Sequence, residues 1–408
     1  MTQIPNRSLG ATEKLFWLLD QASQVHFVMA AELSGKVTSF SLQEALAEIL
    51  KRHPLLSSRI VANGYENPYF EHVPHSVIPL RIIQQHSDQT LAAEMAKELS
   101  MPFNWDIAPL IRCVLVNDAE NPIILFAVHH AVSDGISMTI VIRDMLQVLD
   151  GEPLSISAIP PSIDQLLALD PGIPVLARHM LHETDKPLIR RKQSIPNIYF
   201  EKIDAELSAQ IFSKSKMEGT SFQGTLYAAA IKVARASSFP WSQDQIRVVV
   251  PISVRKDLTD GESSCLYINS RTLLSQEPPE VDFWDLARNA KRELQDVHEQ
   301  DTIQTNGTIA RGRLFSGIPV ADLSLALQQG KVREMMISNL GRFPYNTTLD
   351  KTALHAIWGP VALSGTPNEI TIGLTTVNGS ICVTIATRDK ASHFLGNLVA
   401  ELKKACSL

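Results

Sequence analysis

The chain has 408 residues, of which 45% are hydrophobic and 6% aromatic, a composition that is typical of globular proteins and excludes a largely disordered or fibrous chain. This length exceeds what one ordinary hydrophobic core accommodates, so we expect two domains. The 37 Lys and Arg residues are outnumbered by 43 Asp and Glu residues, and the sequence has no basic block and no zinc-finger spacing, which argues against a nucleic-acid partner.

Signals for a membrane or for export are not found in the sequence. No apolar run approaches the roughly 20 residues that span a bilayer, and the first residues, MTQIPNRSLGATEK, lack the basic and apolar regions of a signal peptide. The 4 cysteines are widely scattered and form neither a disulfide framework nor a metal-ligand pair. We therefore expect a cytoplasmic protein with reduced thiols, no transmembrane segment and no metal site.

The first 150 residues alternate between helical and extended patterns. An apolar stripe predicts a helix over residues 12–21, and residues 26–33 have the composition of a strand. The clearest helix is predicted over residues 41–54, with Ser41 as its N-cap and Pro54 as its stop. The further elements expected in this half are strands at 55–61 and 79–83, a helix at 90–100, and strands at 110–116 and 123–130.

The amino-acid composition of the chain changes after residue 150. Residues 151–197 contain 7 prolines and only weak apolar patterns, so we interpret them as a crossover linker between domains at 1–150 and 198–408, partly helical near 174–183. Asn378-Gly379, flanked by two β-rich runs, predicts a hairpin with a type I′ turn. The other elements expected here are strands at 198–203, 246–253, 266–274 and 334–340, and helices from Ser208, at 222–236 (capped by Thr220), at 283–297 and at 392–406.

The stretch HHAVSDG, residues 129–135, stands between a buried-looking strand and a helical pattern. Side chains alternate along a strand, so only one of His129 and His130 can face a given cleft. A histidine held by a hydrogen-bond acceptor on one ring nitrogen is suited to proton transfer through the other. Asp134 can organise the turn, and Gly135 permits backbone geometry that other residues resist.

A purely structural explanation uses the same residues. Ser133 or Asp134 can simply cap the helix that follows, and both histidines can be satisfied residues at the edge of the core. A metal site is not supported, because adjacent histidines on a strand diverge and no further ligand cluster is present. The combination of strand, double histidine, Asp-Gly turn and helix favours the functional interpretation.

At this motif the sequence resembles the HHxxxDG acyltransferase superfamily, which includes chloramphenicol acetyltransferase, condensation domains of nonribosomal peptide synthetases, and stand-alone mycobacterial polyketide-associated acyltransferases. Other segments of the sequence resemble segments of the family and occur in the same order along the chain. They extend the resemblance across nearly the whole chain. These segments are RHPLLSSRI at 52–60, MPFNWDIAPLIRCVL at 101–115, VVVPISVRKDL at 248–258, LYINSRTLL at 266–274 and ISNLGRF at 337–343. The DFGWG sequence of the plant branch is missing, and so is a carrier-protein serine motif, so we expect a free-standing enzyme that is not of the plant type.

The resemblance implies an α/β fold with α+β layers, in which two chloramphenicol-acetyltransferase-like domains form a V with a tunnel between them. It implies that His130 is the general base, and that His129, Asp134, Gly135 and Arg255 support the motif, with Asp134 paired to Arg255. An amide near Gly135 would stabilise the oxyanion. The tunnel or substrate positions that it suggests are Ser133, Asn269, Ser338, Asn339 and Gly341.

The leading functional hypothesis is an O-acyltransferase of lipid or polyketide biosynthesis. It would use acyl-CoA or an acyl carrier protein as thioester donor and an alcohol as acceptor, with no bound cofactor. One alternative is a condensation-type enzyme that forms an amide with an amine acceptor, and another is a catalytically silent binding module. A carrier protein or polyketide synthase is the expected macromolecular partner, with the basic stretches LIRRKQ at 188–193 and ELKK at 401–404 as weak docking candidates, and a monomer would suffice.

Overall fold

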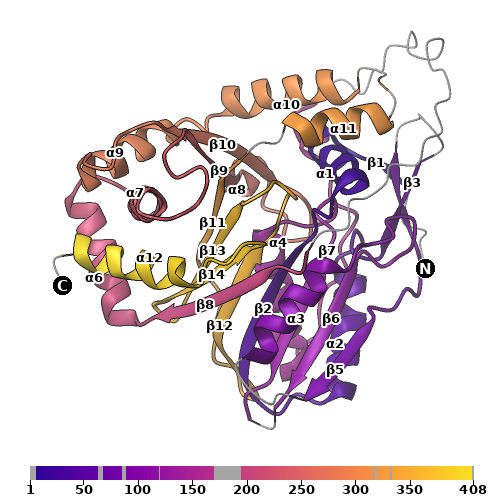
Figure 1. Cartoon of the computed structure of the whole chain (residues 1–408). Coiled ribbons are helices and arrows are strands. Elements are labelled where there is room, and N and C mark those ends of the chain that lie inside the picture. The colour runs from indigo at the N-terminus through magenta and orange to yellow at the C-terminus, as the bar shows by residue number, and fades with distance from the viewer. Residues whose placement is uncertain are drawn as a thin grey trace.

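The structure is a computed structural model of the whole chain, shown in Figure 1. It describes residues 6–62, 68–84, 89–118, 120–169, 194–315, 318, 320–330 and 333–406. The helix predicted near 174–183 and the basic stretch at 188–193 lie outside the described residues. The domain boundaries stay a prediction.

The N-terminal half alternates strands and helices, and most of its predicted elements are confirmed within a few residues. Its elements are β1 (Arg7–Ser8), α1 (Ala11–Ala22), β2 (Phe27–Gly35), α2 (Ser39–Arg52), β3 (Ser58–Val61), β4 (Tyr69–His72), β5 (Leu80–Gln84), α3 (Gln89–Ser100), β6 (Ile111–Asn117), β7 (Ile123–Val128), α4 (Gly135–Asp150) and α5 (Ile163–Leu166).

The C-terminal half adds helices and strands that the sequence patterns did not indicate, notably α10, α11 and β12. Its elements are β8 (Asn197–Ile203), α6 (Ala205–Met217), α7 (Phe222–Arg235), β9 (Ile246–Ser253), α8 (Arg255–Leu258), β10 (Ile268–Ser275), α9 (Phe283–Glu293), α10 (Gln300–Leu314), α11 (Val320–Gly330), β11 (Met335–Arg342), β12 (Thr352–Val361), β13 (Ile370–Val377), β14 (Ser380–Thr387) and α12 (Ser392–Ala405).

Local chemistry explains where individual elements begin and turn. Helix α2 starts two residues earlier than predicted, because Thr38 is its N-cap and Ser41 completes a reciprocal capping box three residues later. Between β13 and β14, Asn378 and Gly379 have φ values of 50° and 81°, which are the positive angles that a type I′ turn requires. The predicted hairpin is therefore confirmed, with Val377 paired to Ser380.

The described strands form three sheets. A small sheet has the order β1-β4-β3, a five-stranded sheet has the order β12-β2-β7-β6-β5, and a six-stranded sheet has the order β10-β9-β11-β13-β14-β8. Strand β12 comes from the C-terminal half but pairs antiparallel with β2 in the sheet of the N-terminal half. The two halves therefore share a sheet as well as an interface.

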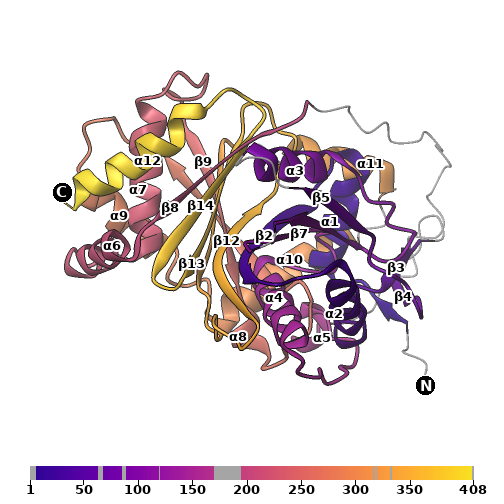
Figure 2. The same ribbon diagram turned by 90° about the horizontal axis from the view of Figure 1, so that it is seen from below.

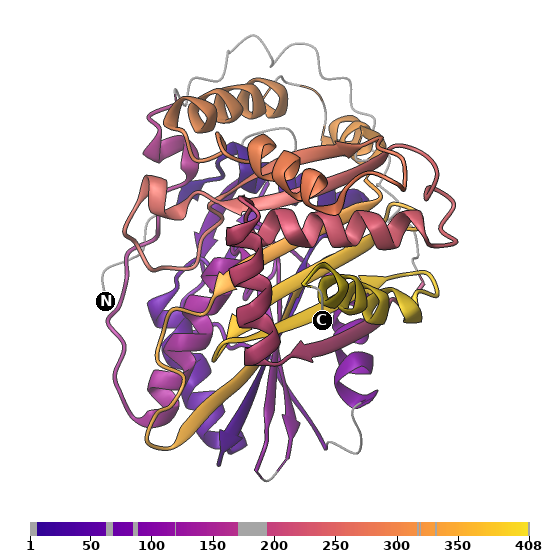
Figure 3. The ribbon, with the colours of Figure 1, turned by 90° about the vertical axis from the view of Figure 1, so that its left-hand side faces the viewer.

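The helices cover the outer faces of these sheets. Helices α6, α7, α9 and α12 lie on the side of the six-stranded sheet that faces away from the N-terminal half, as Figure 2 shows and as the view in Figure 3 confirms. Helices α2 and α4 pack together on a face of the five-stranded sheet. Helix α1 packs against α10 and α11, so it too contacts the C-terminal half.

The backbones of the two larger sheets come close together where β12 passes β13. Gly359 has φ of 100°, and its amide donates to Thr384 Oγ1 at 2.8 Å. A methyl group at Gly373 would lie 2.1 Å from Pro360 O, so only glycine fits at this crossing. The crossing brings Pro360 and the residues after it to the edge of the cavity described below.

Candidate active site

The HHxxxDG residues occupy the turn between β7 and α4. All residues of β7 are buried, so the strand anchors the turn in the core. Asp134 caps α4, because its Oδ1 accepts a hydrogen bond from the amide of Ser137 at 2.6 Å. The motif therefore lies between two rigid elements, which is the support that a proton-transferring side chain needs.

His130 is half-buried, and its ring is held on three sides. Its Nδ1 lies 3.0 Å from the carbonyl oxygen of Ser133. A carbonyl only accepts, so Nδ1 carries the hydrogen and the neutral ring has its lone pair on Nε2. The ring stacks on Phe16 with centroids 4.0 Å apart and is tilted against Phe27 at 4.8 Å. This arrangement fixes both the tautomer and the plane of the imidazole.

His129 points into the core and is fully buried. Its Nδ1 accepts a hydrogen bond from the amide of Ala131 at 3.1 Å, and its Nε2 lies 3.7 Å from Asp20 Oδ2. Phe103 meets the ring edge-on. These contacts support the turn, and His129 is not among the residues that line the cavity described below.

The direct ion pair predicted between Asp134 and Arg255 is wrong. Asp134 uses its two oxygens for the amides of Ser137 and Tyr267, the latter at 2.8 Å. The Arg255 guanidinium donates instead to Ser137 Oγ at 2.6 Å and to carbonyl oxygens of the segment 261–265. Within the described part of the chain, Ser137 links the two groups. Its amide donates to Asp134, and its hydroxyl oxygen accepts from Arg255.

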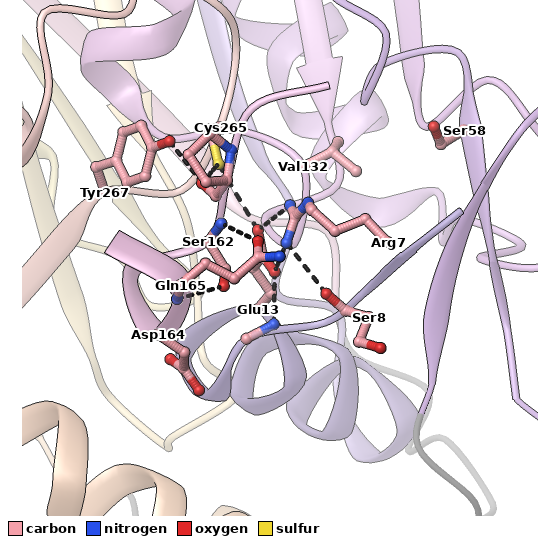
Figure 4. A network of polar contacts seen from close by, with 12 residues as sticks. Arg7, Ser8, Glu13, Ser58, Val132, Ser162, Asp164, Gln165, Cys265 and Tyr267 are labelled. Atoms are coloured by element: carbon pink, nitrogen blue, oxygen red, sulfur yellow. Dashed lines mark hydrogen bonds and ion pairs between the residues drawn. The ribbon is translucent and has the colours of Figure 1, made fainter. Parts of the chain in front are cut away.

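Segment 261–267 of the C-terminal half crosses to the motif and is held there by polar contacts. The buried Arg7–Glu13 pair lies beneath it, and Figure 4 shows these two side chains pointing toward each other beside Cys265 and Tyr267. Cys265 Sγ lies 3.7 Å from Glu13 Oε1, and the Tyr267 hydroxyl donates to Pro161 O at 2.6 Å. Burial raises the pKa of the Cys265 thiol to about 12, so this thiol stays protonated.

A cavity of about 510 Å³ opens between the two halves beside the motif. The N-terminal half contributes Phe27, His130 and residues 134–136. The C-terminal half contributes residues of α7, β9, β10, α9, β11 and β12, together with His298 and Ala362. A cavity of this size with mainly apolar walls and a few polar groups accommodates a small organic substrate.

The predicted tunnel positions divide into two groups. Ser338, Asn339 and Gly341 line the cavity, and Asn339 Oδ1 accepts the amide of Gly341 at 2.9 Å. Ser133 and Asn269 do not line it. The hydroxyl of Ser133 contacts buried Ser264 at 3.0 Å, and Asn269 Oδ1 accepts the amide of Ser270, so both side chains are engaged elsewhere.

Several residues of the site were not predicted as functional. Phe16 and Phe27 both contact the ring of His130, although Phe16 lies in the helix predicted at 12–21, whose apolar stripe indicated only core packing. Gln223, near the start of α7, also lines the cavity. The one available signal was the apolar helix that contains Phe16, and no spacing rule connects it to a histidine 114 residues later.

At Gly135 the motif lies in close contact with the opposite wall of the cavity. A methyl group there would lie 2.5 Å from Leu340 Cδ2 and 3.3 Å from Pro360 Cγ. We expect Gly135→Ala to lower the free energy of unfolding by about 1–3 kcal/mol through overpacking. Urea titration measures this loss. In a Leu340→Ala background, Gly135→Ala should cost much less, and equal costs in both backgrounds would contradict steric conflict with Leu340.

We expect the burial of His26, close to His129 of the motif, to make stability depend on pH. Burial is the main cause that lowers the pKa of His26 from 6.5 to about 4, opposed by Asp20. Between these values the unfolded chain binds a proton that the folded protein does not, so stability should fall as pH falls from about 7 to about 4. Urea midpoints across this range test the prediction. The His26→Gln variant, which keeps a donor for Glu98 O, should reduce the slope, and an unchanged slope would rule out His26 as its source.

No helix in the described residues has both the length and the apolar character needed to cross a membrane. Within the same residues, no cluster of three or more His, Cys, Asp or Glu side chains is arranged to hold a metal ion.

Comparison with known proteins finds similarity to condensation domains. Residues 15–164 match the family model of the condensation domain. Bacitracin synthase 3 of Bacillus licheniformis is 24% identical over 371 residues, which cover 84% of this chain but 6% of that protein. The chain therefore spans only a small part of the curated relatives that it matches.

Solved structures extend the likeness to the whole chain. Polyketide synthase associated protein 5 from Mycobacterium tuberculosis superposes with a TM-score of 0.70 at 16% identity, covering 100% of this chain and 98% of that one. The trichothecene 15-O-acetyltransferase TRI3 from Fusarium sporotrichioides gives a TM-score of 0.70 at 14% identity, covering 98% and 94%. The chain thus has the fold of the chloramphenicol-acetyltransferase-like proteins and condensation domains, and the predicted resemblance to the HHxxxDG acyltransferase superfamily is confirmed.

Proposed function

We propose that this protein transfers an acyl group from a thioester donor to a hydroxyl acceptor and so forms an ester. The observation that carries the proposal is the state of His130. Its Nδ1 is held by the Ser133 carbonyl, and the residue lines the cavity between the halves. An imidazole that is held through Nδ1 beside a cavity is suited to general-base catalysis through Nε2.

The proposed reaction begins at His130. His130 Nε2 removes the proton of the acceptor hydroxyl, and the oxygen attacks the thioester carbonyl carbon to form a tetrahedral intermediate. Gly135 and Ile136 line the cavity at the start of α4, where the first amides of a helix have no partner within the helix. These amides would stabilise the oxyanion. The carbon–sulfur bond then breaks, and the thiolate takes the proton from His130.

The second candidate is an amide-forming condensation, in which an amine replaces the hydroxyl acceptor. The match of residues 15–164 to condensation domains favours it, and so does the likeness to bacitracin synthase 3. The name of TRI3, an O-acetyltransferase, supplies the precedent for an ester on this fold. A catalytically silent binding module is the third candidate.

The donor in this proposal is acyl-CoA or the phosphopantetheine thioester of an acyl carrier protein, with no resident cofactor. The peptide-synthase relatives and the polyketide-associated structure support a carrier protein or a synthase as partner. One polypeptide supplies both walls of the cavity, so we propose that a monomer is active.

The test is thiol release from acyl-CoAs of increasing chain length, each offered with pooled alcohols or pooled amines. Release that requires an alcohol supports the ester, and release that requires an amine overturns it in favour of the amide. Binding of acyl thioesters without release in any pool would support the silent binding module.

A further inference from the structure

Three fully buried polar side chains form a set of contacts that reaches the motif turn. They are His53 at the end of α2, Asp144 within α4, and Ser264 in the crossing segment of the C-terminal half. None of the three lines the cavity. Burying such groups is costly unless each is hydrogen-bonded, so their contacts indicate what they do.

The first two form a fixed pair. His53 Nε2 lies 2.9 Å from Asp144 Oδ2, and His53 Nδ1 accepts a hydrogen bond from the amide of Ser264 at 3.0 Å. The ring is therefore neutral, with its hydrogen on Nε2. Asp144 is held in turn by Arg143 at 2.6 Å. His53 thus joins a helix of the N-terminal half to the backbone of the crossing segment.

Ser264 carries this contact on to the motif. Its hydroxyl lies 3.1 Å from Val132 O and 3.0 Å from Ser133 Oγ. Val132 and Ser133 are the two residues just before Asp134, and the carbonyl oxygen of Ser133 accepts the hydrogen bond from His130 Nδ1. The buried chain of contacts therefore ends on Ser133, the residue whose carbonyl oxygen sets the tautomer of His130.

We propose that Ser264 is a positioning residue for His130 and that the His53–Asp144 pair holds Ser264 in place. This inference rests on the proposed function, in which His130 is the base. Ser264 belongs to the C-terminal half, so a contact between the two halves supports the orientation of the imidazole. A base displaced by about 1 Å loses on the order of 100-fold in rate, which makes such support necessary.

The kinetic test compares Ser264→Ala with Ser263→Ala. Ser263 is the matched control, because it is the adjacent buried serine and, among the described residues, its hydroxyl makes no hydrogen bond to the motif. We expect Ser264→Ala to lower kcat roughly 10- to 100-fold with little change in KM, and Ser263→Ala to leave both near wild type. Loss of thermal stability in Ser264→Ala with kcat unchanged would overturn the inference and leave only a structural role.

A second measurement does not depend on turnover. Nitrogen-15 chemical shifts of histidine report which ring nitrogen carries the hydrogen, and the His130→Gln variant assigns the signal of His130. We expect a single Nδ1–H tautomer in the wild type and a mixture in Ser264→Ala. If Ser264→Ala keeps the single tautomer, the positioning role is wrong. If the tautomer shifts but His130→Ala keeps full activity, the proposed function fails while the positioning contact stands.

Two variants of His53 test the supporting pair. The oxygen of Asn occupies the place of Nδ1, so His53→Asn keeps an acceptor for the Ser264 amide but loses the contact with Asp144. The nitrogen of Gln occupies the place of Nε2, so His53→Gln keeps that contact but loses the acceptor. We expect kcat to fall further in His53→Gln than in His53→Asn. The reverse order would show that Asp144, and not Ser264, is what His53 serves.

Discussion

Replacement of His130 by alanine should lower acceptor-dependent thiol release by about 10²–10⁴-fold, which is the usual contribution of a general base. The half-buried ring contacts Phe16 and Phe27, so the variant loses some packing but keeps the core strand β7 and the capped helix α4. The loss should appear in kcat, because the proton transfer belongs to the transition state and not to ground-state binding. Steady-state assays with the best donor and acceptor pair measure it.

The matched control is His393→Ala, which removes an exposed histidine at the start of α12, outside the cavity between the halves. That variant should retain wild-type kcat and KM. Isothermal titration with a non-hydrolysable acyl-CoA analogue should give similar affinities for wild type and His130→Ala. Equal turnover of His130→Ala and wild type would exclude this imidazole as the base.

Replacement of Asp134 by alanine should have the largest effect on stability. The side chain is fully buried, caps α4 through Ser137 and accepts the amide of Tyr267 from the other half. Loss of a cap costs about 0.5–2 kcal/mol. An unsatisfied buried amide adds about 1–3 kcal/mol, so the free energy of unfolding should fall by roughly 2–5 kcal/mol.

Asp204→Ala isolates the capping part of this effect. Asp204 caps α6 by accepting the amide of Leu207 at 2.8 Å, but it is exposed and, among the described residues, makes no hydrogen bond to the N-terminal half. Its replacement should cost only about 1 kcal/mol in urea unfolding. If both variants lose the same stability, the bond from Asp134 to Tyr267 contributes nothing measurable.

Much of the secondary structure could be predicted, because its causes are local. The hairpin around Asn378-Gly379 follows from turn chemistry, and α2 follows from helical spacing. Strand β12 could not be predicted, since Gly359-Pro360 within it argues against a strand. Its partner strand, β2, lies more than 300 residues earlier in the sequence. Helix α10 is polar and contains two glycines, so it lacks a clear apolar stripe.

In the candidate site, too, some features could be predicted from the sequence and others could not. The sequence pattern around HHAVSDG predicted that His130 lies between a strand and a helix. The family resemblance indicated which segments surround the cavity. The hydrogen bonds of Asp134 and Arg255 could not be predicted from the sequence, because the partners of both side chains are backbone atoms and Ser137. Nearly every residue carries a backbone donor and acceptor, so the pattern of side chains does not indicate which of them a buried group will bond.

The exchange of strand β12 between the halves bears on how this protein can be re-engineered. A chimera that joined residues 1–197 to a foreign C-terminal half would leave β2 as an open sheet edge, with a row of unpaired backbone groups that invites aggregation. A graft that carries Thr352–Val361 along with its N-terminal partner strand avoids that edge. Substrate-swapping designs on this scaffold should therefore place their junctions by sheet membership and not by order along the chain.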